Sequence, residues 1–158
     1  TDEGETQMKM FRVFTAVALA FVAALGVAQP ASAAVTWKFQ GSGTSVCLDG
    51  YPTHPAGAVY YTGCNDGAFQ NFRWVGSFGR QTQLVSNQSN KCAWGEGDQV
   101  GLATCNGSPS QVWVVSGSAS RLTIRHLHSG KCVARLGPPN VRLQTCDDRL
   151  PNQFWFKR

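Results

Sequence analysis

Val141-Arg142-Leu143-Gln144-Thr145-Cys146 is the stretch that decides the fold, because two earlier stretches carry the same pattern. These are Val59-Tyr60-Tyr61-Thr62-Gly63-Cys64 and Val100-Gly101-Leu102-Ala103-Thr104-Cys105. The three closing cysteines are 41 residues apart in both intervals. In these stretches apolar residues recur at every second position, which is typical of a half-buried strand. The sequence therefore predicts one repeat of about 41 residues, present three times.

Two further landmarks recur with nearly the same spacing, the glutamines at intervals of 41 and 42 residues. A Gln-x-aromatic motif follows each closing cysteine, at Gln70-Asn71-Phe72, Gln111-Val112-Trp113 and Gln153-Phe154-Trp155. The first cysteines of the second and third copies lie in Ser89-Asn90-Lys91-Cys92 and Ser129-Gly130-Lys131-Cys132. Because residue type and spacing agree at every landmark, the glutamines and aromatic residues of the motif are assigned to the scaffold, with the buried amides bonded to backbone.

Six cysteines follow residue 35 and none precedes it. An even number of cysteines behind a secretory signal is typical of a disulfide framework. Equal copies should have equal pairings, so we expect Cys47–Cys64, Cys92–Cys105 and Cys132–Cys146. Each disulfide would close a loop of roughly 15 residues, which the chain-entropy model values at about 3 kcal/mol.

The repeat also indicates how the chain closes. Short alternating stretches separated by turns rich in glycine, asparagine and proline predict about four strands per repeat and about twelve in all. The first copy lacks its opening strand, while the chain ends on a spare one, Phe154-Trp155-Phe156. We expect this last strand to complete a ring beside Trp37-Lys38-Phe39, because closure removes open sheet edges. The fold class is therefore all-β, with no helical periodicity after residue 35.

The chain begins differently. Residues 8–33 contain a short basic region, an apolar run from Val13 to Val27 and an Ala31-Ser32-Ala33 cleavage motif, which together predict a secretory signal peptide. The apolar run is about 15 residues long, short of the ~20 that a membrane-spanning helix needs, so a transmembrane anchor is the weaker reading. Residues 1–7 are an upstream extension, and 35–158 form one domain. We expect a secreted, extracellular protein without a membrane anchor after cleavage.

The domain is basic. Residues 35–158 hold 12 Lys and Arg against 6 Asp and Glu. Such a surface could meet nucleic acid or an anionic cell wall. The cationic residues are scattered rather than gathered in a run, which favours a solubilising charge over specific nucleic-acid binding.

The triple pattern of a first cysteine, Val-x-Leu-x-x-Cys and Gln-x-Trp resembles the ricin B-chain type β-trefoil, also classed as a family 13 carbohydrate-binding module, here of a secreted bacterial kind. The resemblance covers residues 35–158. It implies a β-trefoil of three repeats, each able to carry a shallow sugar site. The usual parts are an Asp two residues after the first cysteine, a polar residue four before the second, an aromatic two before it, and an Asn ahead of Gln-x-Trp. Carboxylates and amides bond sugar hydroxyls, while an aromatic face covers the C–H face of the ring.

Carried over to this chain, the resemblance leaves no site complete. The first repeat keeps Asp49, places Tyr60 at the polar position and adds Tyr51 nearby, but Thr62 and Phe69 replace the aromatic and the Asn. In the second repeat the four positions hold Trp94, Gly101, Ala103 and Ser110. In the third they hold Ala134, Arg142, Gln144 and Asn152. The first repeat is therefore the expected carbohydrate site, with Asn152 and Arg142 as a weaker second.

Each candidate also has a plainer interpretation. Asp49 precedes Gly50 and could serve only a turn. Tyr60 alternates with Val59 and Tyr61, so it is expected to point outward, where a tyrosine is often only a good strand former. Trp94 is either an exposed stacking platform or a packed loop residue.

Catalysis is not expected. The acidic pairs Glu96 with Asp98 and Asp147 with Asp148 are near neighbours on turns, so they should not face each other across a cleft as a glycosidase requires. His126 and His128 could share a strand face suited to a metal, but no third ligand is apparent, so a solvated face is expected. No metal and no cofactor are predicted.

The leading hypothesis is a non-catalytic, secreted, monomeric module that binds a polysaccharide or glycan. The alternative is a protein-interaction scaffold, such as an inhibitor or a toxin-associated subunit, in which the sugar sites have decayed. Such a scaffold would have a protein partner in place of a glycan.

Overall fold

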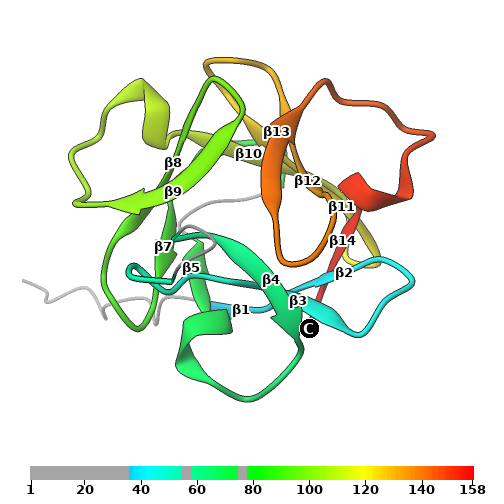
Figure 1. Ribbon diagram of the computed structural model, residues 1–158. Coiled ribbons are helices and arrows are strands. Elements are labelled where there is room, and N and C mark those ends of the chain that lie inside the picture. Colours follow the sequence, from blue (N-terminus) through cyan, green and yellow to red (C-terminus); the bar gives the residue numbers. More distant parts are fainter. Residues whose placement is uncertain (1–35, 55–57, 75–77) are drawn as a thin grey trace, which may run out of the picture. The chain divides into compact units, whose positions relative to one another are not determined.

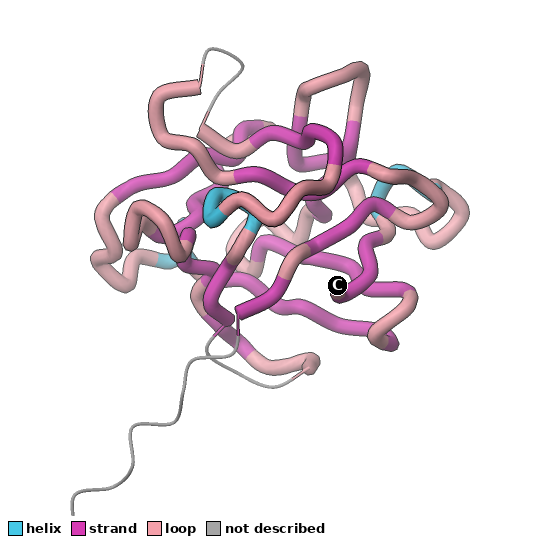
Figure 2. The backbone as a smooth tube through the Cα atoms, turned by 90° about the horizontal axis from the view of Figure 1, so that it is seen from below, coloured by secondary structure: helices cyan, strands magenta, loops and turns pink. Residues whose placement is uncertain are grey.

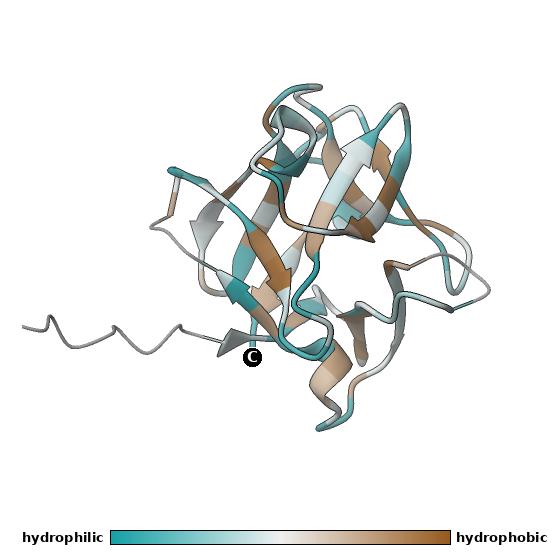
Figure 3. Ribbon diagram, turned by 90° about the vertical axis from the view of Figure 1, so that its left-hand side faces the viewer, coloured by the Kyte–Doolittle hydropathy of each residue, from teal (hydrophilic) through white to brown (hydrophobic). Residues whose placement is uncertain are grey.

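Alternation of apolar and polar residues determines which face of each strand is buried. In β11 (Arg121–His126) the even-numbered residues are buried and the odd-numbered ones face outward, and hydrophobic and hydrophilic residues alternate along the strands in Figure 3. The computed structural model describes residues 36–54, 58–74 and 78–158. The predicted signal peptide, 8–33, and the extension, 1–7, lie outside the described residues. Within those ranges no helix is long and apolar enough to cross a membrane.

The described residues form fourteen strands and three single-turn 3-10 helices, with no α-helix among them (Figure 1). The strands besides β11 are β1 (Thr36–Trp37), β2 (Phe39–Gly41), β3 (Val46–Asp49), β4 (Tyr60–Gly63), β5 (Phe72–Trp74), β6 (Gln81–Thr82), β7 (Leu84–Ser86), β8 (Cys92–Glu96), β9 (Gln99–Ala103), β10 (Trp113–Ser118), β12 (Cys132–Arg135), β13 (Val141–Gln144) and β14 (Trp155–Lys157). The 3-10 helices are η1 (Ala68–Gln70), η2 (Pro109–Gln111) and η3 (Pro151–Gln153).

The strand number exceeds the expected twelve for a local reason. The stretch predicted as one strand at residues 37–39 is divided at Lys38 into β1 and β2, and residues 81–86 are divided at Gln83 into β6 and β7. The backbone of Lys38, between the two strands, exchanges hydrogen bonds with that of Arg158 at 3.3 and 3.0 Å. Each division adds one strand without changing the order of the others.

The strands pair into two sheets, ordered β1-β5-β7-β8-β9 and β13-β12-β11-β14-β2-β3-β4, with β10 pairing β11 and β6. The pairing of β14 with β2 closes the structure as predicted, with Trp155 opposite Gly41 and Lys157 opposite Phe39. Figures 1 and 2 show the chain's last strand beside its first described ones. Three equivalent repeats closed in this way form the β-trefoil that the resemblance implies.

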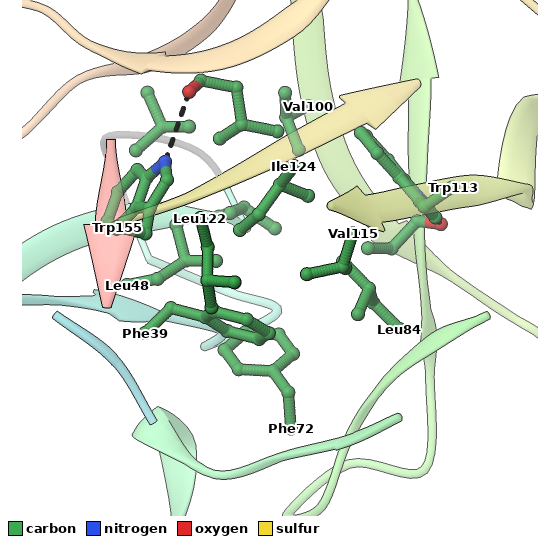
Figure 4. Packing of buried hydrophobic residues seen from close by; sticks show 14 of the residues in the cluster. Phe39, Leu48, Phe72, Leu84, Val100, Trp113, Val115, Leu122, Ile124 and Trp155 are labelled. Carbon is green, nitrogen blue, oxygen red and sulfur yellow. Dashed lines mark hydrogen bonds between the residues drawn. The ribbon is translucent and has the colours of Figure 1, made fainter. Parts of the chain in front are cut away.

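The interior of the trefoil is filled by the Gln-x-aromatic residues and their apolar neighbours (Figure 4). Trp113 and Trp155 have no exposed surface, and Phe72 holds the equivalent place in the first repeat with 1% exposed. The two indole N–H groups donate to Ala93 O at 2.9 Å and Val133 O at 3.1 Å. A buried indole N–H usually has such a partner, although those of Trp37 and Trp74 have none among the described residues.

The three motif glutamines are buried and bond to the backbone in the same way in every repeat. Each side-chain oxygen accepts a backbone N–H at 2.9 Å from the loop before the 3-10 helix. Each side-chain nitrogen donates to a carbonyl near the closing cysteine, at 2.8 to 3.0 Å. The glutamines thus fix the path of the loop between the second strand of each hairpin and the next strand.

Three disulfides join Cys47 to Cys64, Cys92 to Cys105 and Cys132 to Cys146. The paired cysteines are 17, 13 and 14 residues apart in the sequence. Each links the ends of one two-stranded hairpin, which are β3–β4, β8–β9 and β12–β13. The tips of these hairpins hold the candidate sites.

Candidate carbohydrate-binding site

The three candidate sites lie at equivalent cross-strand pairs. The residue two positions after each first cysteine faces, across its hairpin, the residue four before the second cysteine. These pairs are Asp49 with Tyr60, Trp94 with Gly101, and Ala134 with Arg142. Residues directly opposite in an antiparallel pair bring their side chains close together. Each repeat can therefore be judged by what this pair presents.

In the first repeat the pair is polar and buried. Asp49 is 4% exposed and Tyr60 is 8% exposed, and the Tyr60 hydroxyl, the Gln70 amide and the backbone N–H of Gly50 lie near enough to the Asp49 carboxylate to lower its pKa. Burial raises the pKa of Asp49, and the hydrogen bond from Tyr60 opposes that rise. Burial, with the nearby Asp49 charge, raises the pKa of Tyr60 to about 12. The tyrosine is therefore a hydrogen-bond donor at any physiological pH.

One oxygen of this carboxylate lacks a donor. Oδ1 of Asp49 is buried and accepts no hydrogen bond from the described residues. Leaving such an acceptor unpaired costs roughly 1–3 kcal/mol. A native structure that keeps an unpaired buried carboxylate oxygen often does so for a ligand or a solvent molecule. A hydroxyl is the smallest group that could satisfy it.

Aromatic rings surround Asp49 in a way that the sequence did not predict. Tyr60, expected to point outward, is covered by His54, whose ring stacks on it with centroids 3.6 Å apart and planes 12° apart. Tyr51, 40% exposed, lies 4.7 Å from Phe69, the residue at the family's Asn position. We call Asp49, Tyr60, His54, Tyr51 and Phe69 the Asp49 cluster. It offers a carboxylate with aromatic surface beside it.

His54 was missed because it belongs to no motif. It lies in the loop between β3 and β4, where neither spacing nor periodicity indicates a contact with Tyr60. The only sequence signal was the length of this hairpin loop, since the first disulfide encloses more residues than the other two. A longer loop has room to fold an aromatic ring back over the strand pair.

In the second repeat, the side chain of Trp94 packs on Gly101, the residue opposite it in the hairpin. A Cβ on Gly101 would lie 2.6 Å from Cε2 of Trp94, so the indole lies directly against the glycine. Trp94 is on β8 and half-buried. It is therefore neither a free platform nor a loop residue, because its ring occupies the place that a ligand would take between the two strands.

The third repeat has lost its carboxylate and uses its amide internally. Ala134 is fully buried, and Arg142 opposite it donates to the carbonyl of its neighbour Val141 at 3.1 Å. Nδ2 of Asn152 donates to Arg135 O at 2.9 Å. The structure therefore does not bring Asn152 and Arg142 together with any acid at this position.

The two histidines considered for a metal are differently placed. His126 is 1% exposed, so the expected solvated strand face is wrong for this residue. Its Nε2–H donates to Ser110 O at 3.1 Å and its Nδ1 accepts from the Ser129 hydroxyl at 2.9 Å, while burial lowers its pKa. His128 lies beyond the end of β11. Within the described part of the chain, no three potential ligands gather into a metal-binding group.

Sequence comparison now decides the family. The model of the ricin-type β-trefoil lectin domain matches residues 35–155. The chain belongs to the ricin-type β-trefoil lectin domain family. Membership of this lectin family supports carbohydrate binding as a general function. No curated protein matches the chain.

Solved structures confirm the fold of this ricin-type domain. The designed three-fold symmetric protein ThreeFoil is 20% identical with a TM-score of 0.66, covering 77% of this chain and 96% of that one. The cytolethal distending toxin of Haemophilus ducreyi is 16% identical with a TM-score of 0.64, covering 81% and 85%. GalNAc-T7, solved with UDP, GalNAc and Mn²⁺, is 24% identical with a TM-score of 0.62, covering 78% of this chain but 22% of that one. At these identities the likeness concerns the fold alone.

Proposed function

We propose that this lectin domain is a secreted, non-catalytic module that binds a glycan through one weak site, the Asp49 cluster of its first repeat. The observation that carries the proposal is the unpaired, buried Oδ1 of Asp49. A sugar hydroxyl supplies the missing donor, and the bond to a charged acceptor is stronger than one between neutral groups. Tyr51 provides exposed aromatic surface for the C–H face of the ring.

Weak binding follows from the small opening. Asp49 is 4% exposed and its Oδ1 is buried, so a sugar hydroxyl reaches this oxygen only when neighbouring side chains move aside, which costs part of the binding free energy. The aromatic position of the family holds Thr62, so the stacking surface comes from Tyr51 at the side of the cluster. The second and third repeats contribute no comparable acid, which leaves a single contact without the avidity of three.

The test is a binding screen of the protein against a glycan array and a set of insoluble polysaccharides, in parallel with Asp49→Asn. The variant keeps the shape of the side chain and removes its charge. We expect retention of the wild-type protein on a subset of sugars and loss of at least about tenfold in the variant, as for a lost hydrogen bond to a charged group. Equal retention of both proteins would remove the Asp49 cluster from the proposal.

A second candidate is supported by the filled second repeat. Trp94 packs on Gly101 and Ala134 is buried, so neither position presents a polar pair to a sugar. Under this second candidate the domain is a scaffold for a protein partner. No retention on any sugar, together with a tight protein complex, would favour this candidate.

A further inference from the structure

The third repeat carries an open groove, lined by both polar and apolar groups, on a surface separate from the Asp49 cluster. It encloses about 960 Å³ between the outer face of β11, the Cys132–Cys146 disulfide and the loop of residues 147–150. An adjoining hollow of about 340 Å³ shares Asp148, Arg149 and Phe154 with it. In the sheet, β14 and β2 separate β11 from β3, which bears Asp49. The loop and β14 are the orange-to-red segments of Figure 1. We call this surface the third-repeat groove.

The groove is built from features that the other two repeats lack. Arg125 pairs with the first cysteine of its repeat, where the earlier copies hold Gln40 and Val85. The loop from the closing cysteine to the motif glutamine is one residue longer here, since the conserved amide bond spans six residues instead of five. The longer loop carries Arg149. The changes that set the third copy apart therefore converge on one surface.

The charges of the groove favour an anionic ligand. Four cationic side chains line it and its adjoining hollow, against two carboxylates; they are Arg121, Arg125, Lys131 and Arg149. One carboxylate, Asp147, is neutralised by Arg149 through two side-chain bonds of 3.0 and 2.9 Å, which hold the pKa of Asp147 below its usual range. Arg125 is exposed and has no charged partner among the described residues.

The walls of the groove are held in place before any ligand arrives. Arg121 donates to Asp148 O at 2.7 Å and lies 3.9 Å above the Phe154 ring, which ties the loop to β11. Nζ of Lys131 donates to Gly97 O at 2.9 Å. Fixed side chains lose little entropy on binding, so the part of the groove formed by Arg121 and Lys131 is pre-organised.

The mixture of polar and apolar groups in the lining favours a carbohydrate over a nucleic acid. Thr123, Gln144 and Thr145 offer hydroxyl and amide groups suited to sugar hydroxyls. Phe154 is the one aromatic side chain of the lining, and it is 8% exposed beneath Arg121. Bases would find no open ring on which to stack. A volume near the upper end of ligand sites suits several sugar units.

We propose that the third-repeat groove binds an acidic polysaccharide, one whose carboxylate or sulfate groups meet Arg125 and Lys131. This site deepens the proposed carbohydrate-binding function but does not depend on Asp49. It would allow one domain to contact a neutral sugar and an acidic polymer on different surfaces.

The test measures the binding of the full chain to three polymers of similar length at the same low salt concentration. They are polygalacturonate, dextran sulfate and neutral dextran. We expect binding to both acidic polymers and none to dextran. The double variant Arg125→Gln with Lys131→Gln should bind the acidic polymers on the order of tenfold more weakly. The matched control, Arg80→Gln with Lys91→Gln, removes the same charge elsewhere, and Lys91 is the second-repeat equivalent of Lys131. It should change affinity by less than about twofold, because distant charges are screened.

Three results would overturn the proposal. The first is that the wild-type protein binds neither acidic polymer. The second is that the control pair weakens binding as much as the groove pair, which would show that the attraction is diffuse. The third is that a single-stranded oligothymidylate binds more tightly than both polymers through the same residues, which would make nucleic acid the ligand. Asp49→Asn separates this site from the first one, since it should leave polymer binding unchanged. Failure at one site therefore leaves the other to be judged on its own data.

Discussion

At the scale of single residues, Asp49 carries both the proposed function and a cost in stability. Its pKa is raised by burial, so its charged form is favoured less in the folded chain than in the unfolded chain. The group thus contributes most to stability below its unfolded pKa, and that contribution is lost as pH rises through the raised folded pKa. Binding has the opposite dependence, because the sugar hydroxyl needs the charged acceptor.

The variant Asp49→Asn should separate the two effects. We expect its melting temperature at pH 7 to equal or exceed that of the wild type, because no charge remains buried, while glycan binding is lost. Scanning calorimetry between pH 3 and pH 7 should show that the wild-type protein loses stability relative to the variant as pH rises. A variant that melts several degrees lower at pH 7 would instead assign Asp49 a structural role.

The Tyr60 hydroxyl provides a second prediction at this scale. Its hydrogen bond lowers the pKa of Asp49 against the effect of burial. Tyr60→Phe removes the bond and keeps the ring that stacks on His54. Glycan binding should therefore weaken on the acid side, with the midpoint of its pH profile displaced upward, as measured by titration calorimetry at several pH values. A profile that coincides with that of the wild type would exclude Asp49 as the titrating acceptor.

At the scale of elements, the closure between β2 and β14 depends on a buried arginine. Arg135 on β12 donates to Pro151 O at 2.8 Å, Phe154 O at 3.3 Å and Ser42 O at 3.5 Å. Burial lowers its pKa, although a guanidinium remains charged. A Cβ on Gly41 would lie 1.5 Å from its Nη1. Because Gly41 has no side chain, β2 leaves room for the guanidinium of Arg135.

Gly41→Ala should displace Arg135, which leaves Ser42 O without a donor and removes the charged donor from Pro151 O and Phe154 O, each of which keeps one backbone N–H. We expect a loss of about 2–4 kcal/mol in unfolding free energy, in line with broken buried hydrogen bonds to a charged group. Urea titration provides the measurement. Gly63→Ala on the exposed end of β4 is the matched control, since nothing lies within 4 Å of its added carbon, and it should differ little from wild type. Equal effects of the two substitutions would contradict the role given to Arg135.

How far the sequence predicts these elements depends on what each residue contacts. Strands, hairpins and ring closure follow from the repeat, because every copy repeats the same local pattern. The position of Tyr60 does not, since it depends on His54 in a loop without periodicity. The packing of Trp94 on Gly101 also escaped prediction, because it joins two residues whose individual propensities indicate nothing about each other. The contacts that differ among the three copies can therefore be found only in the structure.

At the scale of the whole molecule, three disulfides stabilise a domain of modest size. Each encloses a loop of 13 to 17 residues. Replacing Cys92 and Cys105 together by alanine should lower the unfolding free energy by about 2–4 kcal/mol, measured by urea titration. The sugar-binding profile should persist, because this disulfide belongs to the repeat without a polar pair. Loss of binding in the folded variant would mean that the second repeat takes part in the site.

Of the three equivalent cross-strand pairs, only Asp49 with Tyr60 forms the proposed sugar site, and a residue-resolved titration tests this most directly. The ¹H–¹⁵N spectrum of the labelled protein is recorded as the best-binding glycan from the screen is added. We predict that shifts concentrate on Asp49, Gly50, Tyr51 and Tyr60. Shifts centred instead on Trp94 and Gly101, or on Ala134 and Arg142, would contradict it.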